Sequence, residues 1–211
     1  MNLMPKDRFQ RVFFLLFLVF FIASCIKPPY MQFLLMQHVP TVLAVFLLVY
    51  LSNRFTISRL SFSLIILFFC LHTLGARYLY SYFPYDDLSE FLFGINISET
   101  FGFHRNHYDR MVHFCYGLLL TVPAQEVARR HFHLSVALSC VLAVVFIIAT
   151  SAGYEFIEWL VAKTFTPEWA DQFLGQQGDM FDAQKDMALA MTGAVLSASI
   201  LAFSRRSKRT C

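Results

Sequence analysis

The sequence predicts an all-α membrane protein, a polytopic bundle of six transmembrane helices that forms a single integral membrane domain over residues 1–211. Of the 211 residues, 57% are hydrophobic and 15% are charged, which is typical of a polytopic membrane protein rather than of a soluble domain. Six apolar stretches each approach the length of about 20 residues that a helix needs to cross a bilayer. The net charge of +3 comes from basic residues spread over short loops, so it does not indicate binding to nucleic acid.

The predicted spans follow one another along the chain. The first apolar run lies behind Lys6, Arg8 and Arg11, as a signal peptide would, but the five later spans favour an uncleaved first helix. The six spans cover about residues 9–26, 32–51, 60–82, 110–128, 134–160 and 184–203.

Lysine and arginine predict the orientation of the bundle. In a six-span arrangement the N-terminus, the second-to-third connection, the fourth-to-fifth connection and the C-terminal tail lie on one side, and they hold 11 of the 17 basic residues. Because cytoplasmic loops carry the excess of basic residues, both termini are expected in the cytoplasm. The two longest loops, about residues 83–109 and 161–183, then face outward.

Acidic and imidazole side chains gather at the outward ends of the later spans. Asp109 and His113 are four residues apart at the start of the fourth span, so they share a helix face. Glu155 and Glu158, three residues apart, share a face at the end of the fifth span. Ionisable groups inside a membrane span are energetically costly, and they usually mark a functional site.

A third acidic group opens the last span. Asp179, Asp182 and Asp186 are spaced by three and four residues, so all three are expected on one side of the helix start. A carboxylate at a helix N-terminus is favourable in itself, which explains Asp179 or Asp182 as a cap but does not explain Asp186, one turn further in. Taken alone, the other groups also have plain explanations: an interhelical hydrogen bond for His113, and a water-facing pair for the glutamates.

Carboxylates together with one histidine suit a divalent cation, which is the cofactor that the sequence suggests without identifying the metal. The same groups suit general acid–base chemistry, or the passage of protons or cations. The predicted catalytic residues are His113, Glu155 and Glu158. The predicted metal ligands are Asp109, His113, Asp182 and Asp186. Arg77 and Arg110 are the predicted substrate-binding residues, because a guanidinium holds an anionic head group well.

Four strings of residues together resemble the YjdF family, a group of uncharacterised bacterial inner-membrane proteins. The likeness extends over nearly the whole chain, and it implies a multi-pass protein of the bacterial inner membrane whose outward side is the periplasm. It implies no activity. The strings cover residues 72–75, 109–114, 154–159 and 178–187.

A looser likeness is to VanZ-like membrane proteins, which are associated with glycopeptide resistance. Asp186 stands where that pattern leads us to expect an asparagine, so the likeness supports a shared outward polar pocket and no common mechanism. The residues that fit are Asp109, Arg110, His113, Glu155, Asp179, Asp182 and Gly193.

The leading hypothesis is a periplasm-facing membrane enzyme, metal-dependent or not, that acts on a lipid or an envelope precursor within the bilayer. The sequence carries no nucleophile elbow, no H-E-x-x-H and no phosphate-binding loop, so the reaction type stays open. A small transporter or a proton or cation permeation protein is the alternative; its path to the cytoplasm would need Gln37, His38, Gln125 and Glu126, which are sparse. A third hypothesis is a non-catalytic envelope assembly factor whose acids only hold the bundle together.

Overall fold

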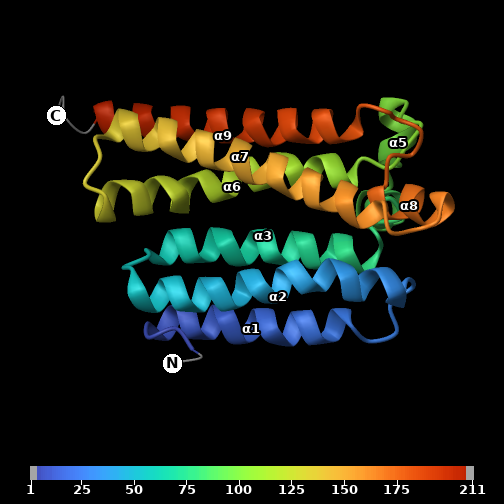
Figure 1. Ribbon diagram of the computed structural model, residues 1–211, viewed down its shortest axis with the longest axis horizontal. Coiled ribbons are helices and arrows are strands. Elements are labelled where there is room, and N and C mark those ends of the chain that lie inside the picture. Colours follow the sequence, from blue (N-terminus) through green and yellow to red (C-terminus); the bar gives the residue numbers. More distant parts are fainter. Residues whose placement is uncertain (1–3, 208–211) are drawn as a thin grey trace.

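The computed structural model describes residues 4–207, and every regular element in that range is a helix (Figure 1). The long helices are α1 (Arg8–Ser24), α2 (Met31–Arg54), α3 (Arg59–Arg77), α6 (Tyr108–His131), α7 (Val136–Ala162) and α9 (Asp182–Ser207). The short helices are α4 (Tyr85–Phe93), α5 (Ile97–Phe101) and α8 (Pro167–Leu174). The all-α prediction is therefore confirmed.

The long helices lie side by side in two groups of three (Figure 1). One group consists of α1, α2 and α3, the other of α6, α7 and α9, and α3 packs against α6 where the groups meet. The short helices α5 and α8 lie at one end of the bundle, which we call the loop end. Helix α1 begins and α9 ends at the opposite end, so the helices run alternately up and down.

Four of the described helices are long and apolar enough to cross a membrane: α2, α3, α7 and α9. Helix α1 has only 17 residues, and α6 carries five Asp, Glu, Lys or Arg side chains. An integral membrane protein is thus supported by four helices, and six crossings stay a prediction.

Helix α3 is shorter than the predicted third span, which reached residue 82. It ends at Arg77, and the chain then turns through Leu79 and Tyr80, whose φ angles are 52° and 50°. Positive φ is strained for such residues and persists only where surrounding contacts hold it. Here the Leu79 side chain is buried in a cluster with Phe33, and the Tyr80 hydroxyl bonds to His72.

Two glycines allow α6 and α9 to approach closely. A Cβ atom on Gly117 would overlap the carbonyl oxygen of Ala190, and one on Gly193 would overlap the carbonyl oxygen of Phe114. Small residues of this kind are the usual means by which membrane helices bring their backbones together. The crossing brings the first turns of α6 close to the first turns of α9, and these turns carry the predicted metal ligands.

At the opposite end of the bundle, Glu126 on α6 holds the start of α3. Its carboxylate accepts hydrogen bonds from Ser58 N at 3.1 Å and Ser58 Oγ at 2.7 Å, and Arg130 Nη1 lies 2.6 Å away. The hydroxyl of Ser61 also donates to it. Glu126 therefore acts as a cap for α3, because exposed N–H groups at a helix start attract an anion.

Candidate functional site

Three of the predicted metal ligands come together at the loop end. Asp109 and His113 on α6 and Asp186 on α9 each offer a ligand atom, and these atoms all lie within 4.8 Å of one another. Asp186 is far from Asp109 and His113 in the sequence, and the close approach of α6 and α9 at Gly117 and Gly193 brings the three residues together. Two carboxylates and one imidazole at this spacing form a candidate site for a divalent cation.

Two buried carboxylate oxygens in this cluster have no hydrogen-bond partner, namely Asp186 Oδ1 and Glu155 Oε1. The Asp186 residue is only 2% exposed. Glu155 comes from α7, and its Oε1 atom lies 3.4 Å from His113 Nε2, while Asp109 Oδ1 lies 3.6 Å from the same nitrogen. Buried polar atoms are nearly always satisfied in folded proteins, so these two oxygens indicate that the cluster holds protons or a cation.

Asp182, the fourth predicted ligand, has different partners. Its two oxygens accept from Arg105 Nη1 at 2.6 Å and Nη2 at 3.1 Å, and Arg110 Nη2 lies 3.2 Å away. This is the bidentate arrangement in which a guanidinium holds a carboxylate most firmly. The Asp182 residue is 2% exposed, so the pairs are almost dry. Asp182 therefore neutralises two arginines, and it does not belong to the group of Asp109, His113 and Asp186.

Asp179 completes the same ion-pair network nearer to solvent. Its Oδ2 atom lies 2.5 Å from Lys185 Nζ and 2.6 Å from Arg110 Nη2. The hydrogen bond from Lys185, helped by those from Phe181 N and Arg110, lowers the pKa of Asp179 to about 2. A lowered carboxylate pKa stabilises the fold above the unfolded value of 3.8, and this contribution is lost as the pH falls through about 2. Asp179 therefore stays ionised and keeps its ion pairs at neutral and mildly acidic pH.

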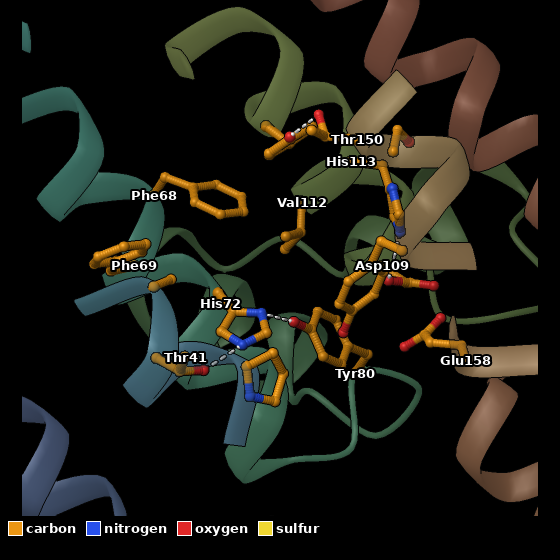
Figure 2. Close-up of a pocket in the computed structure, with 15 residues that line it drawn as sticks. Thr41, Phe68, Phe69, His72, Tyr80, Asp109, Val112, His113, Thr150 and Glu158 are labelled. Atoms are coloured by element: carbon orange, nitrogen blue, oxygen red, sulfur yellow. Dashed lines mark hydrogen bonds and ion pairs between the residues drawn. The ribbon is translucent and has the colours of Figure 1, made fainter. Parts of the chain in front are cut away.

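Glu158, unlike Glu155, lines a cavity, although the two share a helix face. This cavity of about 280 Å³ lies between α2, α3, α6 and α7, and Asp109 and His113 also project into it (Figure 2). In Figure 2 the His113 ring points toward Asp109, with Glu158 beyond it. The two glutamates thus serve neighbouring parts of one site: Glu155 meets the imidazole, and Glu158 borders the cavity.

A chain of buried hydrogen bonds lies on the other side of the cavity. The hydroxyl of Thr41 donates to the Gln37 carbonyl at 3.1 Å, so it accepts from His72 Nε2 at 2.7 Å. The Nδ1 atom of His72 is then left to accept from the hydroxyl of Tyr80. Burial raises the pKa of Tyr80 well above its usual value, an effect to which Asp109 and Glu158 add. The phenol therefore stays protonated.

The Tyr80 ring packs directly against the backbone of Gly75. A Cβ atom on Gly75 would overlap the ring at its Cε1 and Cδ1 atoms. The absence of a side chain at position 75 is what lets the ring lie across the end of α3, with its hydroxyl on His72.

The two predicted substrate-binding arginines have other partners. Arg77 donates to backbone carbonyls where α1 ends, those of Ser24, Ile26 and Lys27, and it does not line the cavity. Arg110 is paired with Asp179 and Asp182. Neither guanidinium is positioned as a free anion site, although the Nε atom of Arg110 is buried without a partner.

Sequence reasoning did not find Arg105 or Tyr80 as parts of this site. Arg105 lies in a loop, 77 residues before Asp182, and it also donates to the Gln176 carbonyl at 3.0 Å. Tyr80 follows the end of α3, and its side chain lines the cavity. No local periodicity marks either residue. The signal that could have indicated Arg105 is its position as a basic residue in an outward loop, on the same side of the membrane as the acidic residues.

Acidic groups outnumber basic ones around the cluster, which contains six carboxylates and three permanently cationic side chains. The excess favours bound protons or a bound cation, since like charges at close range in a partly dry site repel one another. The carboxylates are Asp109, Glu155, Glu158, Asp179, Asp182 and Asp186, and the cations are Arg105, Arg110 and Lys185.

Comparisons with known proteins agree with the membrane setting. A family model described as predicted membrane protein (DUF2238) matches residues 9–207. The inner membrane protein YjdF of Escherichia coli (strain K12) is 34% identical over 173 residues, which cover 80% of this chain and 77% of that protein. No solved structure matches at a significant level. The chain therefore belongs to the DUF2238 family of predicted membrane proteins, and it is a multi-pass protein of the bacterial inner membrane.

Proposed function

We propose that this protein is a membrane-embedded enzyme that uses a divalent cation to act on the polar head of a lipid or a lipid-linked envelope precursor. The observation that carries the proposal is the meeting of Asp109, His113 and Asp186 from two helices, with the buried Asp186 Oδ1 left without a partner. In an acid-rich site of this kind a divalent ion offsets repulsion that the paired arginines leave in place.

The proposal includes a topology. All six long helices cross the membrane as one domain, with both termini in the cytoplasm and the loop end in the periplasm. The short α1 and the charged α6 cross because α1 packs on α3, and because α6 packs on α3, α7 and α9. The charges of α6 lie within its first and last turns, apart from Glu126, which caps α3. Such positions are the least costly for charges on a spanning helix.

The chemistry follows from the neighbours of the cation. A divalent ion held by Asp109, His113 and Asp186 would polarise a bound phosphoryl or carbonyl oxygen. Glu155, whose Oε1 lies 3.4 Å from His113 Nε2, is within reach to accept a proton from a water or a substrate hydroxyl. Glu158 lies at the cavity, where it is suited to return a proton to a leaving group. Asp182, Arg105 and Arg110 position the start of α9.

Two observations favour an enzyme over the alternatives. The transport hypothesis needs Glu126 as part of a polar path, but its carboxylate is held by Ser58, Ser61 and Arg130. The assembly-factor hypothesis needs acids that only pair with bases. That description fits Asp182, but it does not fit Asp186 or Glu155, each of which has an unpartnered buried oxygen.

The test measures metal binding and lipid turnover on purified protein in nanodiscs. Titration with Mn²⁺ and Zn²⁺ is expected to show one site, weakened at least tenfold by His113→Ala and by Asp186→Asn. Glu155→Gln is expected to retain the metal and to lose turnover of a bacterial inner-membrane lipid extract, because it removes the base and leaves the ligands.

Glu99→Gln on α5 is the matched control, since Glu99 is an exposed acid at the same end of the bundle. It should change neither reading. Unchanged metal binding and turnover in His113→Ala, Asp186→Asn and Glu155→Gln would end the enzyme proposal. Cation flux into liposomes that is abolished by Glu126→Gln would favour transport instead.

A further inference from the structure

The cavity beside the acidic cluster has an end lined by charged groups and a deeper part that contains its aromatic rings. Along α6 its lining runs from Asp109 to Tyr116, which is about 10 Å along the helix axis at 1.5 Å per residue. Charged and imidazole groups line it near the loop end, and the deeper walls combine apolar side chains with hydroxyl groups. The charged and imidazole lining comprises His72, Asp109, His113 and Glu158, the hydroxyl-bearing lining comprises Thr41, Tyr80, Tyr116, Thr150, Ser151 and Tyr154, and the apolar lining comprises Pro40, Ala44, Phe68, Phe69 and Val112.

We propose that this cavity holds a hydrocarbon chain of a membrane amphiphile, whose phosphate-bearing head lies at Asp109, His113 and Asp186. The inference rests on the proposed function for its head-group site, and it adds the substrate class: a long-chain phosphate ester, with its chain between α2 and α3 on one side and α6 and α7 on the other. Because the cluster is acidic, the phosphate binds through the divalent cation and not through a free arginine.

The lining of the cavity fits a chain better than it fits water. Phe68 and Phe69 stand on one wall and Val112 on the facing side, as Figure 2 shows. The hydroxyls of Tyr116 and Thr150 bond to each other, and that of Thr41 is bonded to the Gln37 carbonyl and to His72, so these groups are already satisfied without water. An empty space of about 280 Å³ lined by aromatic rings would lose packing contacts. The volume is close to the lower end of the range for small-molecule pockets, about 300–1,000 Å³, so it suits a single chain.

The polar residues mark where the chain ends and the head begins. The Tyr80 hydroxyl donates to His72 and Thr41 holds that imidazole, so neither His72 nitrogen is free to bind a ligand. On the opposite side, Asp109 and His113 offer ligand atoms toward Asp186. A head group is therefore drawn to the α6–α9 side, while the Tyr80 ring limits how far the chain can extend toward the loop end.

The test uses a dodecyl phosphate that carries a photoreactive diazirine on its last carbon, in nanodiscs of phosphatidylethanolamine and phosphatidylglycerol with Mn²⁺ present. Labelling mapped by mass spectrometry is expected at Phe68, Phe69 or Tyr116. Unlabelled dodecyl phosphate should compete at least tenfold better than inorganic phosphate, which shares the head chemistry and lacks the chain. Labels confined to lipid-facing side chains, or equal competition by inorganic phosphate, would overturn the inference.

A pair of tryptophan variants on α2 tests the same point by filling the cavity. Ala44 lines the cavity, whereas the neighbouring Leu43 is 65% exposed on the outside of the helix. Ala44→Trp should lower cavity labelling at least tenfold, Leu43→Trp should leave it unchanged, and both should keep Mn²⁺ binding. If Ala44→Trp does not fold, the labelling map of the unmodified protein decides alone.

The outcomes separate this inference from the proposed function. Metal binding that depends on His113 without any cavity labelling overturns the chain-binding inference and leaves the metal site standing. Cavity labelling that survives both the removal of Mn²⁺ and His113→Ala supports chain binding but overturns the head-group position, and with it the metal-dependent enzyme.

Discussion

At the scale of single residues, helical spacing predicts which side chains share a face but not which partner each one meets. Asp109 and His113 lie together as their spacing of four indicates, and Glu155 reaches the same imidazole from α7. Asp182 and Asp186 are also four apart, yet the first is paired with arginines and the second has an unpartnered oxygen. The difference is made by a loop residue, Arg105, that no periodicity marks.

This division of roles leads to a prediction for Asp182→Asn. The change leaves the buried Arg105 without its bidentate partner, and breaking a buried pair in this way costs about 3 kcal/mol of the free energy of unfolding. Metal binding should be retained by the protein that stays folded. The measurement is a thermal or detergent unfolding curve with a parallel Mn²⁺ titration.

Asp186→Asn is the matched comparison, because it lies one turn away and is equally buried. It should lose the metal and be destabilised much less than Asp182→Asn. A result in which Asp182→Asn abolishes metal binding at full stability would return Asp182 to the ligand set.

At the scale of elements, the apolar runs of the sequence predict where the helices lie. The residue at which each helix ends depends on tertiary contacts, which the apolar runs do not reveal. The predicted spans fall on α1, α2, α3, α6, α7 and α9, with ends that differ by a few residues. The third span was predicted five residues too long, because no glycine or proline stands between Arg77 and Pro84 to signal the turn. Leu79 and Tyr80 turn there because a buried cluster and His72 hold them.

The crossing of α6 and α9 gives a prediction at this scale. Gly193→Val would force a branched side chain against the Phe114 carbonyl, and overpacking of this kind costs about 1–3 kcal/mol of the free energy of unfolding, or more. It should also separate Asp186 from His113 and so weaken metal binding. Both effects can be measured by a thermal melt and a Mn²⁺ titration.

Gly153→Ala on α7 is the control for this experiment, since nothing lies within 4 Å of a Cβ atom at that position. It should be neutral or stabilising by up to about 1 kcal/mol, because alanine favours a helix more than glycine does. Equal stability of the two variants would mean that α6 and α9 do not cross closely.

At the scale of the whole molecule, composition predicts the class of protein, and the family match agrees with it. Hydropathy alone predicts fewer crossings, because α1 is short and α6 carries five charged side chains. Two of these, Asp109 and Arg110, belong to the site, where ionisable groups interrupt the apolar pattern. The other three lie toward the opposite end of the helix, so the site explains only part of this departure.

The six-crossing topology places two reporter fusions on opposite sides of the membrane, and each reporter is chosen to be active on its own side. Green fluorescent protein at the C-terminus should fluoresce, because it would lie in the cytoplasm. Alkaline phosphatase inserted between α4 and α5, near Gly94, should be active, because it would lie in the periplasm. Active phosphatase at the C-terminus, or none at Gly94, would contradict the orientation.

The contact between Gly75 and Tyr80 has a consequence for how relatives of this protein diverge. A methyl group at position 75 would displace the phenol from His72, so a larger residue at position 75 requires a change at position 80. Relatives that keep the tyrosine at position 80 are therefore expected to keep glycine at position 75. Those that acquire a larger residue there should also have replaced the tyrosine, and with it the histidine that now depends on its hydroxyl.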